Sequence, residues 1–127
     1  MYMSTTAIAV EQLTPAGRRF VREFAPSQPN GAISSYVLET AQAAEVLLEA
    51  ISRSDGSRAS VLKELRKTEV RDGILGDFRF DTNGDKTPGA ITIYRVTGKS
   101  SPGAGVPPEY EGAVFDRTLP IPDDLLR

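Results

Sequence analysis

A short loop near the middle of the chain carries oxygen-bearing side chains at alternate positions, as the start of a calcium-binding loop does. The candidate ligands are Asp81, Asn83 and Asp85. A calcium loop of the EF-hand type also needs a glycine at its sixth position and a bidentate glutamate at its twelfth. Counted from Asp81, those positions hold Lys86 and Thr92, which fill neither role. We therefore predict no metal site in this loop.

The same loop has the composition of a tight turn. Asn83-Gly84 readily adopts positive φ angles, and the Asp81 side chain can accept a hydrogen bond from the backbone two residues further on. Apolar and polar residues alternate on both sides of the loop, over residues 77–80 and 91–94. The pattern predicts a β-hairpin that is closed by this turn.

Composition excludes several kinds of catalytic chemistry. The chain of 127 residues contains no cysteine and no histidine, which excludes disulfides, thiol chemistry and Ser-His or Cys-His catalysis. Glu45, Glu49 and Glu64 fall on polar helix faces, without the paired geometry that acid-base catalysis needs. Residues 103–105 lack the third glycine and the following helix of a phosphate-binding loop. We predict that the protein is not an enzyme and uses no cofactor.

Charge and hydropathy limit the partners of the chain. The net charge of -2 gives no general attraction to nucleic acid or to an anionic membrane. No apolar run approaches the roughly 20 residues that a membrane span requires. The first ten residues lack the basic start and apolar core of a signal peptide, and they look like a cut made in front of a strand. We expect one domain that does not bind nucleic acid.

Three helices are expected, over residues 15–24, 35–53 and 58–68. Thr14 suits the N-cap of the first helix, and Pro15 suits its first turn. Ser57 can cap the third helix in the same way. A short strand is expected before the first helix, over residues 5–10.

The long helix carries an apolar stripe with spacings of three and four residues. The stripe consists of Val37, Ala41, Ala44, Leu48 and Ile51, and Leu38 and Leu47 widen it. Such a stripe predicts the buried face of the helix. Because the few expected strands leave little sheet to cover it, the chain is expected either to be a piece of a larger protein or to pair with itself.

The composition of the sequence changes after residue 97, where the alternation of apolar and polar residues ends. Glycine, proline and serine dominate residues 98–112, which predicts a loop, and an extended tail is expected to follow it. A short strand is expected at residues 114–117. Pro120 and Pro122 exclude a central strand there, because proline has no N–H to donate to a neighbouring strand.

One series of residues between Pro15 and Val96 carries a resemblance through its order and spacing. The series is Phe20 and Phe24, Tyr36, Leu47-Glu49-Ala50-Ile51, Gly56-Ser57, and then Gly73, Gly76, Phe78, Phe80, Asp81, Gly84 and Asp85. In this order it resembles the carboxyl-terminal part of periplasmic substrate-binding proteins of the branched-chain amino-acid type. These proteins are two-lobed receptors that serve ABC transporters.

The resemblance implies an α/β fold, a fragment of the type I periplasmic-binding-protein fold with three helices, a β-hairpin and short flanking strands. Residues 1–96 would form the receptor-like segment, and residues 97–127 the Gly/Pro-rich loop and extended tail. The parent protein would be extracytoplasmic, in the periplasm or at the cell surface, and membrane-associated. It would bind an amino acid or a related metabolite and have an ABC permease as its partner.

On this basis the expected function is that of a non-enzymatic part of a solute-binding receptor, which contributes to the ligand cleft and to the packing between lobes. The family's G-Y-D-A motif in the long helix is replaced by Thr-Ala-Gln-Ala at residues 40–43, so a Tyr and an Asp are lost together. This loss favours an alternative, a structural or regulatory, sensor-like interaction module that self-associates and binds no small ligand. The isolated chain is expected to form a homo-oligomer.

Three residues at the start of the long helix are the candidate ligand-binding residues, namely Tyr36, Glu39 and Ser35. Tyr36 lies where the resemblance places an aromatic residue at the cleft, but an aromatic residue at such a junction more often packs in the core. Glu39 could receive a ligand ammonium if it faces the cleft, or could only be favoured by the helix dipole. Ser34 and Ser35 could bind a ligand or cap the helix.

Overall fold

The computed structural model describes residues 1–34, 36–98 and 112–122, which form a mixed α/β domain of three α-helices and two three-stranded antiparallel sheets. The helices are α1 (Pro15–Phe24), α2 (Val37–Arg53) and α3 (Arg58–Leu65). One sheet has the order β1-β5-β6, made of β1 (Tyr2–Thr5), β5 (Gly89–Val96) and β6 (Ala113–Ile121). The other has the order β2-β3-β4, made of β2 (Glu69–Gly73), β3 (Gly76–Phe80) and β4 (Lys86–Thr87).

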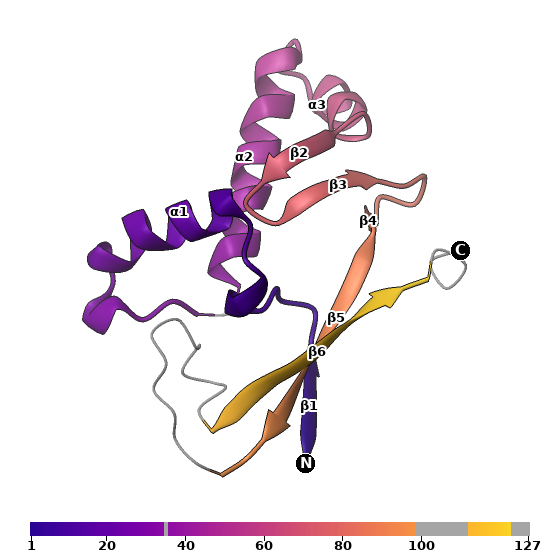
Figure 1. Ribbon diagram of the computed structural model, residues 1–127. Helices are drawn as coiled ribbons and strands as arrows, with labels where there is room; N and C mark the ends of the chain where they lie inside the picture. Colours follow the sequence, from indigo (N-terminus) through magenta and orange to yellow (C-terminus); the bar gives the residue numbers. More distant parts are fainter. Residues whose placement is uncertain (35, 99–111, 123–127) are drawn as a thin grey trace.

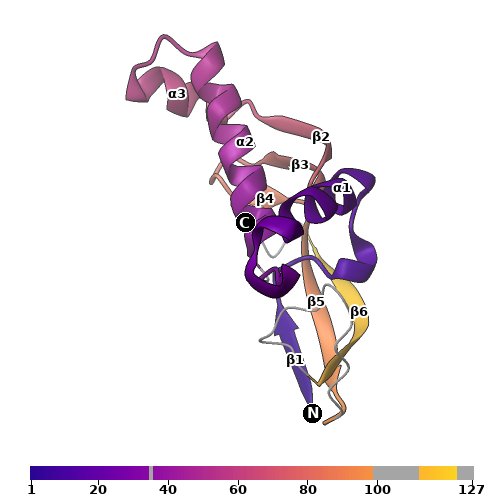
Figure 2. The ribbon, with the colours of Figure 1, turned by 90° about the vertical axis from the view of Figure 1, so that its left-hand side faces the viewer.

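The molecule is elongated. In two perpendicular views the β1-β5-β6 sheet projects at one end, with the N-terminus at its tip, and α3 with the far end of α2 projects at the other (Figure 1, Figure 2). α2 runs past β2 and β3, and α3 folds back beside the end of α2 (Figure 1). The start of α2 therefore lies near the middle of the molecule, where the two sheets meet.

Two small hydrophobic clusters hold these elements together. One lies against the β1-β5-β6 sheet and contains Ala9, Tyr94 and Ala113, with Met3 and Phe115 packed against it. The other lies where α1, the start of α2 and the β2–β3 turn meet, and contains Leu13, Ile33, Leu38 and Ile74. Neither cluster extends to α3, in which no residue is buried.

Both predicted helix caps are confirmed. Thr14 Oγ1 accepts a hydrogen bond from Gly17 N at 2.9 Å, and Pro15 occupies the first turn of α1. The same hydroxyl lies 3.0 Å from the carbonyl oxygen of Ile74, to which it donates, so the cap also ties α1 to the β2–β3 turn. Ser57 Oγ accepts from Ser60 N at 3.2 Å at the start of α3.

The predicted turn at residues 81–85 is confirmed as well. Asp81 Oδ1 accepts hydrogen bonds from the backbone N–H groups of Asn83 and Asp85, each at 2.9 Å. Gly84 has φ of 95°, a conformation that glycine adopts without steric cost. The Asp81 carboxylate is thus engaged by the backbone of its own turn.

The strand that follows this turn differs from the predicted hairpin. Only the two residues of β4 pair with β3, and β5 leaves to pair with β1 and β6. Pro88, between β4 and β5, has no N–H with which to continue the β3 ladder. Gly89 then lies so close to β6 that an added Cβ would come within 3.1 Å of Ile121 Cδ1.

The flanking strands also differ from the expectation of short strands. β6 covers nine residues and not only 114–117, and it pairs with β5 along its length. It is an edge strand of its sheet, which is where Pro120 can be accommodated. The first strand, β1, lies at residues 2–5 and not at residues 5–10, where a 3₁₀ turn (Val10–Gln12) follows instead.

The predicted buried stripe of α2 is wrong for most of the helix. The buried residues of α2 are Leu38, Gln42, Val46 and Ala50, whereas Leu48, in the predicted stripe, is 66% exposed. The helix has a second face with smaller and polar side chains, and that face fits the β2–β3 hairpin. Gln42 Oε1 accepts from Leu75 N at 3.2 Å, and only a glycine at position 73 leaves room for it, because an added Cβ would lie 2.4 Å from this oxygen.

Candidate functional site

A cleft of about 510 Å³ opens where the start of α2 meets both sheets. Its walls come from residues 6–8 after β1, from Glu39 on α2, from Asp77 on β3, from Lys86 on β4, and from β5 and β6. We call it the Glu39 cleft. Segments far apart in the sequence contribute to it, so it forms only in the folded chain.

Of the two carboxylates in this cleft, Glu39 is the more buried, while Asp77 is exposed. Its Oε1 accepts a hydrogen bond from Ile8 N at 3.3 Å, across 31 residues of sequence. Its Oε2 is buried and has no hydrogen-bond partner within residues 1–34, 36–98 and 112–122. Burial raises the pKa of Glu39 above its usual 4.5, and the backbone N–H groups of Glu39 and Ile8 and the charge of Lys86 oppose that rise.

Lys86 brings a positive charge to the same cleft. It pairs with Phe80 in the β3–β4 ladder, and its Nζ lies 5.7 Å from the centroid of the Phe78 ring, within cation–π range. Because Lys86 lines the cleft together with Glu39 and Asp77, the cleft presents two carboxylates and one ammonium group, among them Glu39 and Lys86 as a pair of opposite charge. Such a pair suits a small polar molecule that carries groups of both signs.

The chain opposite Glu39 is fixed by a buried hydroxyl. Thr92 on β5 is buried, and its Oγ1 donates to Ala7 O at 2.9 Å. This bond attaches residues 6–8 to the β1-β5-β6 sheet, so the Ile8 N–H that contacts Glu39 is held by the sheet. These two hydrogen bonds therefore fix one wall of the cleft, formed by residues 6–8.

The three residues predicted for ligand binding have different outcomes. Glu39 lines the Glu39 cleft, and its role in ligand binding stays a prediction. Tyr36 occupies the N-cap position of α2 and is 56% exposed, so the alternative that it packs in the core is wrong. Tyr36 is not among the residues that line the Glu39 cleft, and its role in ligand binding stays a prediction. Ser35 lies outside the described residues. The backbone carbonyl oxygen of Ser34 accepts a hydrogen bond from Val37 N at 3.2 Å.

Sequence reasoning missed two residues of the cleft and one that supports it. In the sequence, Lys86 and Thr92 stand out only as residues unsuited to a calcium loop, and Thr92 also as a member of an alternating strand. Gln42 was noted only for the loss of an acidic residue, but it is 3% exposed and bonds to the β2–β3 turn. The local signal that could have identified Gln42 is its spacing of four residues from both Leu38 and Val46, which places a polar side chain in line with apolar ones on α2.

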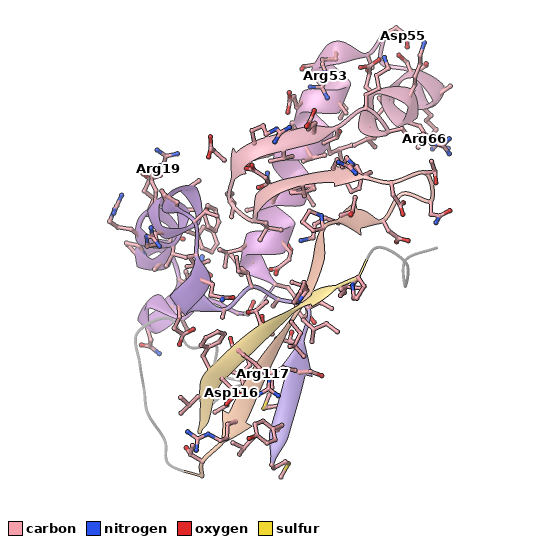
Figure 3. All side chains as sticks on the ribbon, turned by 45° about the vertical axis from the view of Figure 1, so that its right-hand side comes forward. Arg19, Arg53, Asp55, Arg66, Asp116 and Arg117 are labelled. Atoms are coloured by element: carbon pink, nitrogen blue, oxygen red, sulfur yellow. The ribbon has the colours of Figure 1, made fainter. Side chains whose placement is uncertain are left out.

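A second groove, of about 470 Å³, lies between α1, α2 and β2. Its rim is formed largely by charged side chains of both signs, including Arg19, Glu45 and Arg71. Figure 3 shows Arg19 on α1 pointing away from the body of the molecule. Because these charges are exposed to solvent, this groove offers a weaker site than the Glu39 cleft.

Over residues 1–34, 36–98 and 112–122, no three acidic side chains converge in a way that could hold a metal ion. In the same part of the chain, no helix combines the length and the apolar character needed to cross a bilayer.

Comparison with known proteins gives no relative for this chain: no family model, no curated protein and no solved structure matches it.

Proposed function

We propose that the protein is a non-enzymatic part of an extracytoplasmic solute-binding receptor of the branched-chain amino-acid ABC transporter type. In this proposal the Glu39 cleft contributes to the ligand site. The observation that carries the proposal is the Glu39 carboxyl group, which lines a cleft of about 510 Å³ and keeps one buried oxygen without a hydrogen-bond partner among the described residues. A buried acceptor in that state gains free energy when a ligand supplies a donor.

The charges of the cleft favour an amino acid or a related metabolite as the ligand. A ligand ammonium group would donate to Glu39, and a ligand carboxylate would be attracted by Lys86. The last torsion of a glutamate side chain is soft, so the carboxyl group can turn toward a ligand while α2 stays in place. Because binding and release break no covalent bond, the cleft needs no catalytic group.

The open sheets support the second part of the proposal, that the chain packs against further parts of a receptor. Among the described strands, β1 and β6 are edges of one sheet, and β2 and β4 are edges of the other. Edge strands keep unpaired backbone donors and acceptors that a neighbouring lobe can satisfy. A receptor of this kind would deliver its ligand to an ABC permease.

The proposal predicts that the chain binds amino acids at the Glu39 cleft. The ¹⁵N-labelled chain would be titrated with a panel that contains leucine, valine, phenylalanine and glutamate, and backbone NMR shifts would be followed. At least one ligand should shift the amides of Ile8, Glu39 and Lys86, and Glu39→Gln should weaken that binding by about ten-fold or more. Loss of a charge-assisted hydrogen bond of roughly 1.5–3 kcal/mol gives this magnitude.

Glu11→Gln is the matched control, because Glu11 is exposed on the 3₁₀ turn beside the cleft and is not among the residues that line it. This variant should bind like the wild-type chain. Absence of any shift with the whole panel, or binding that Glu39→Gln leaves unchanged, would contradict the proposal.

A further inference from the structure

A patch of exposed apolar side chains covers the end of the molecule opposite the β1-β5-β6 sheet. We call it the α2–α3 patch, and it consists of Leu47, Leu48, Ile51 and Leu62. The most exposed member, Leu48, is 66% exposed. Large apolar side chains that gather on one surface mark an interaction site more often than single exposed ones do. Figures 1 and 2 show that this end projects from the rest of the chain, so another molecule can reach it.

The patch contains both a projection and a socket. A groove of about 320 Å³ lies between α2 and α3, and its apolar lining comes from Ile51, Val61, Leu62 and Leu65. Leu48 is one helical turn before Ile51 on α2 and stands out beside the groove. A surface that carries an exposed leucine next to an apolar groove can be complementary to the same surface of a second copy.

The charges that border the patch differ between its two sides, and ion pairs within this end of the molecule, Glu49 with Arg53 and Glu64 with Arg53 and Lys67, offset part of that difference. On α2, Glu45 and Glu49 follow one another by one turn on the flank that borders β2. On α3, Arg58 borders the groove, and Arg66 follows at the end of the helix. Figure 3 shows Arg66 at the α3 side of this end of the molecule, away from Arg53 on α2. A two-fold axis parallel to α2 would set the acidic flank of one copy against the basic flank of the other.

We propose that the α2–α3 patch is the interface of a two-fold symmetric homodimer, in which Leu48 of each copy enters the α2–α3 groove of its partner. Both the apolar surfaces and the flanking charges are then complementary, which a partner of uniform charge would not achieve. The interface lies nine residues along α2 from Glu39, about 13 Å by the rise of a helix. Dimer formation therefore leaves the Glu39 cleft open and is independent of the proposed ligand binding.

Sedimentation equilibrium of the full chain at several concentrations tests this interface. The wild-type chain, of 13.7 kDa, should show a mass that approaches twice that value as concentration rises. Leu48→Glu should raise the dissociation constant of the dimer at least ten-fold, because a carboxylate would enter an apolar groove. Arg66→Glu should weaken the dimer less, and more at low salt than at high salt.

Leu119→Glu is the control, because Leu119 is also an exposed leucine (44%) but lies on β6 in the other sheet. Its dimer should be as stable as that of the wild-type chain, and circular dichroism melts should show that both leucine variants are folded. A wild-type chain that stays monomeric at every concentration would overturn the proposal, and would favour a different protein segment as the occupant of the patch. A dimer that Leu119→Glu disrupts and Leu48→Glu does not would also overturn it.

Discussion

At the scale of single residues, Glu39 is the side chain with the most unusual environment. Its side chain is partly buried, and its Oε2 is buried with no hydrogen-bond donor among the described residues. A carboxylate at the surface is hydrated and has no buried oxygen to satisfy, whereas an ionised carboxylate inside a hydrophobic core is strongly unfavourable. A ligand that donates a hydrogen bond to Oε2 would offset the desolvation cost of this buried oxygen.

The raised pKa of Glu39 predicts how stability changes with pH. A carboxyl group whose folded-state pKa lies above its unfolded value stabilises the fold below the unfolded pKa and loses that contribution as pH rises through the folded pKa. The Glu39→Gln variant cannot ionise at this position. Relative to the wild-type chain, its free energy of unfolding should therefore increase as pH rises from below 4.5 to neutrality.

Urea unfolding at a series of pH values measures this difference. Asp77 and Lys86, which line the same cleft, are unchanged in both proteins, so the difference between the two proteins reports on position 39. Glu11→Gln should show no comparable trend. A difference between Glu39→Gln and wild type that is constant over this pH range would show that burial does not raise the pKa of Glu39.

At the scale of elements, α2 connects the Glu39 cleft, the β2–β3 turn and the α2–α3 patch. Its first turn carries Glu39, its middle bonds to the β2–β3 turn through Gln42, and its end carries Leu48 and the α2–α3 patch. α1 is in turn tied to the same β2–β3 turn by the Thr14 hydroxyl. The β2–β3 turn is therefore the point at which two helices are positioned relative to the Glu39 cleft.

This arrangement predicts the effect of removing the Thr14 hydroxyl. Thr14→Ala removes the N-cap of α1 and also the donor to the carbonyl oxygens of Gly73 and Ile74. The free energy of unfolding should fall by about 2 kcal/mol, at the upper end of the range for capping residues. Thr14→Ser keeps the hydroxyl and should lose less than half as much. Urea denaturation measures both, and equal losses in the two variants would mean that methyl packing and not the hydrogen bonds matters.

At the scale of the whole molecule, burial is unevenly distributed. One hydrophobic cluster lies in the middle of the molecule and the other lies against the β1-β5-β6 sheet, while α3 contains no buried residue. α2 and α3 are also joined by an ion pair at the surface, in which Arg53 Nε lies 3.8 Å from Glu64 Oε2. Exposed ion pairs contribute little to stability.

The uneven burial predicts a gradient in hydrogen exchange. In the Leu48→Glu variant, which we expect to be monomeric, amides of α3 should exchange at least ten-fold faster than amides of β5 and of the first half of α2. The reason is that few buried contacts oppose local opening at that end. Hydrogen-exchange mass spectrometry with peptides from each element provides the measurement. Uniform protection over the three regions would contradict the prediction.

The amino-acid sequence by itself determined the local features of this fold. The Thr14 and Ser57 caps, the Asp81 turn and the Glu49–Arg53 ion pair each join residues at most four positions apart, so their chemistry is complete within a short segment. Such features form whenever the segment itself is helical or turned. The mixed α/β composition followed from the same local patterns.

Only the tertiary structure decided which of these elements meet. α2 has apolar residues on two faces, and the face that is buried depends on the shape of the β2–β3 hairpin, as the Gln42 contact shows. The departure of β5 to pair with β1 and β6 depends on strands that are distant in the sequence. Glu39 was a candidate from its type, but its cleft exists because Ile8, 31 residues away, is brought to it. Contacts over such distances are chosen by the packing of the whole chain, which no local pattern contains.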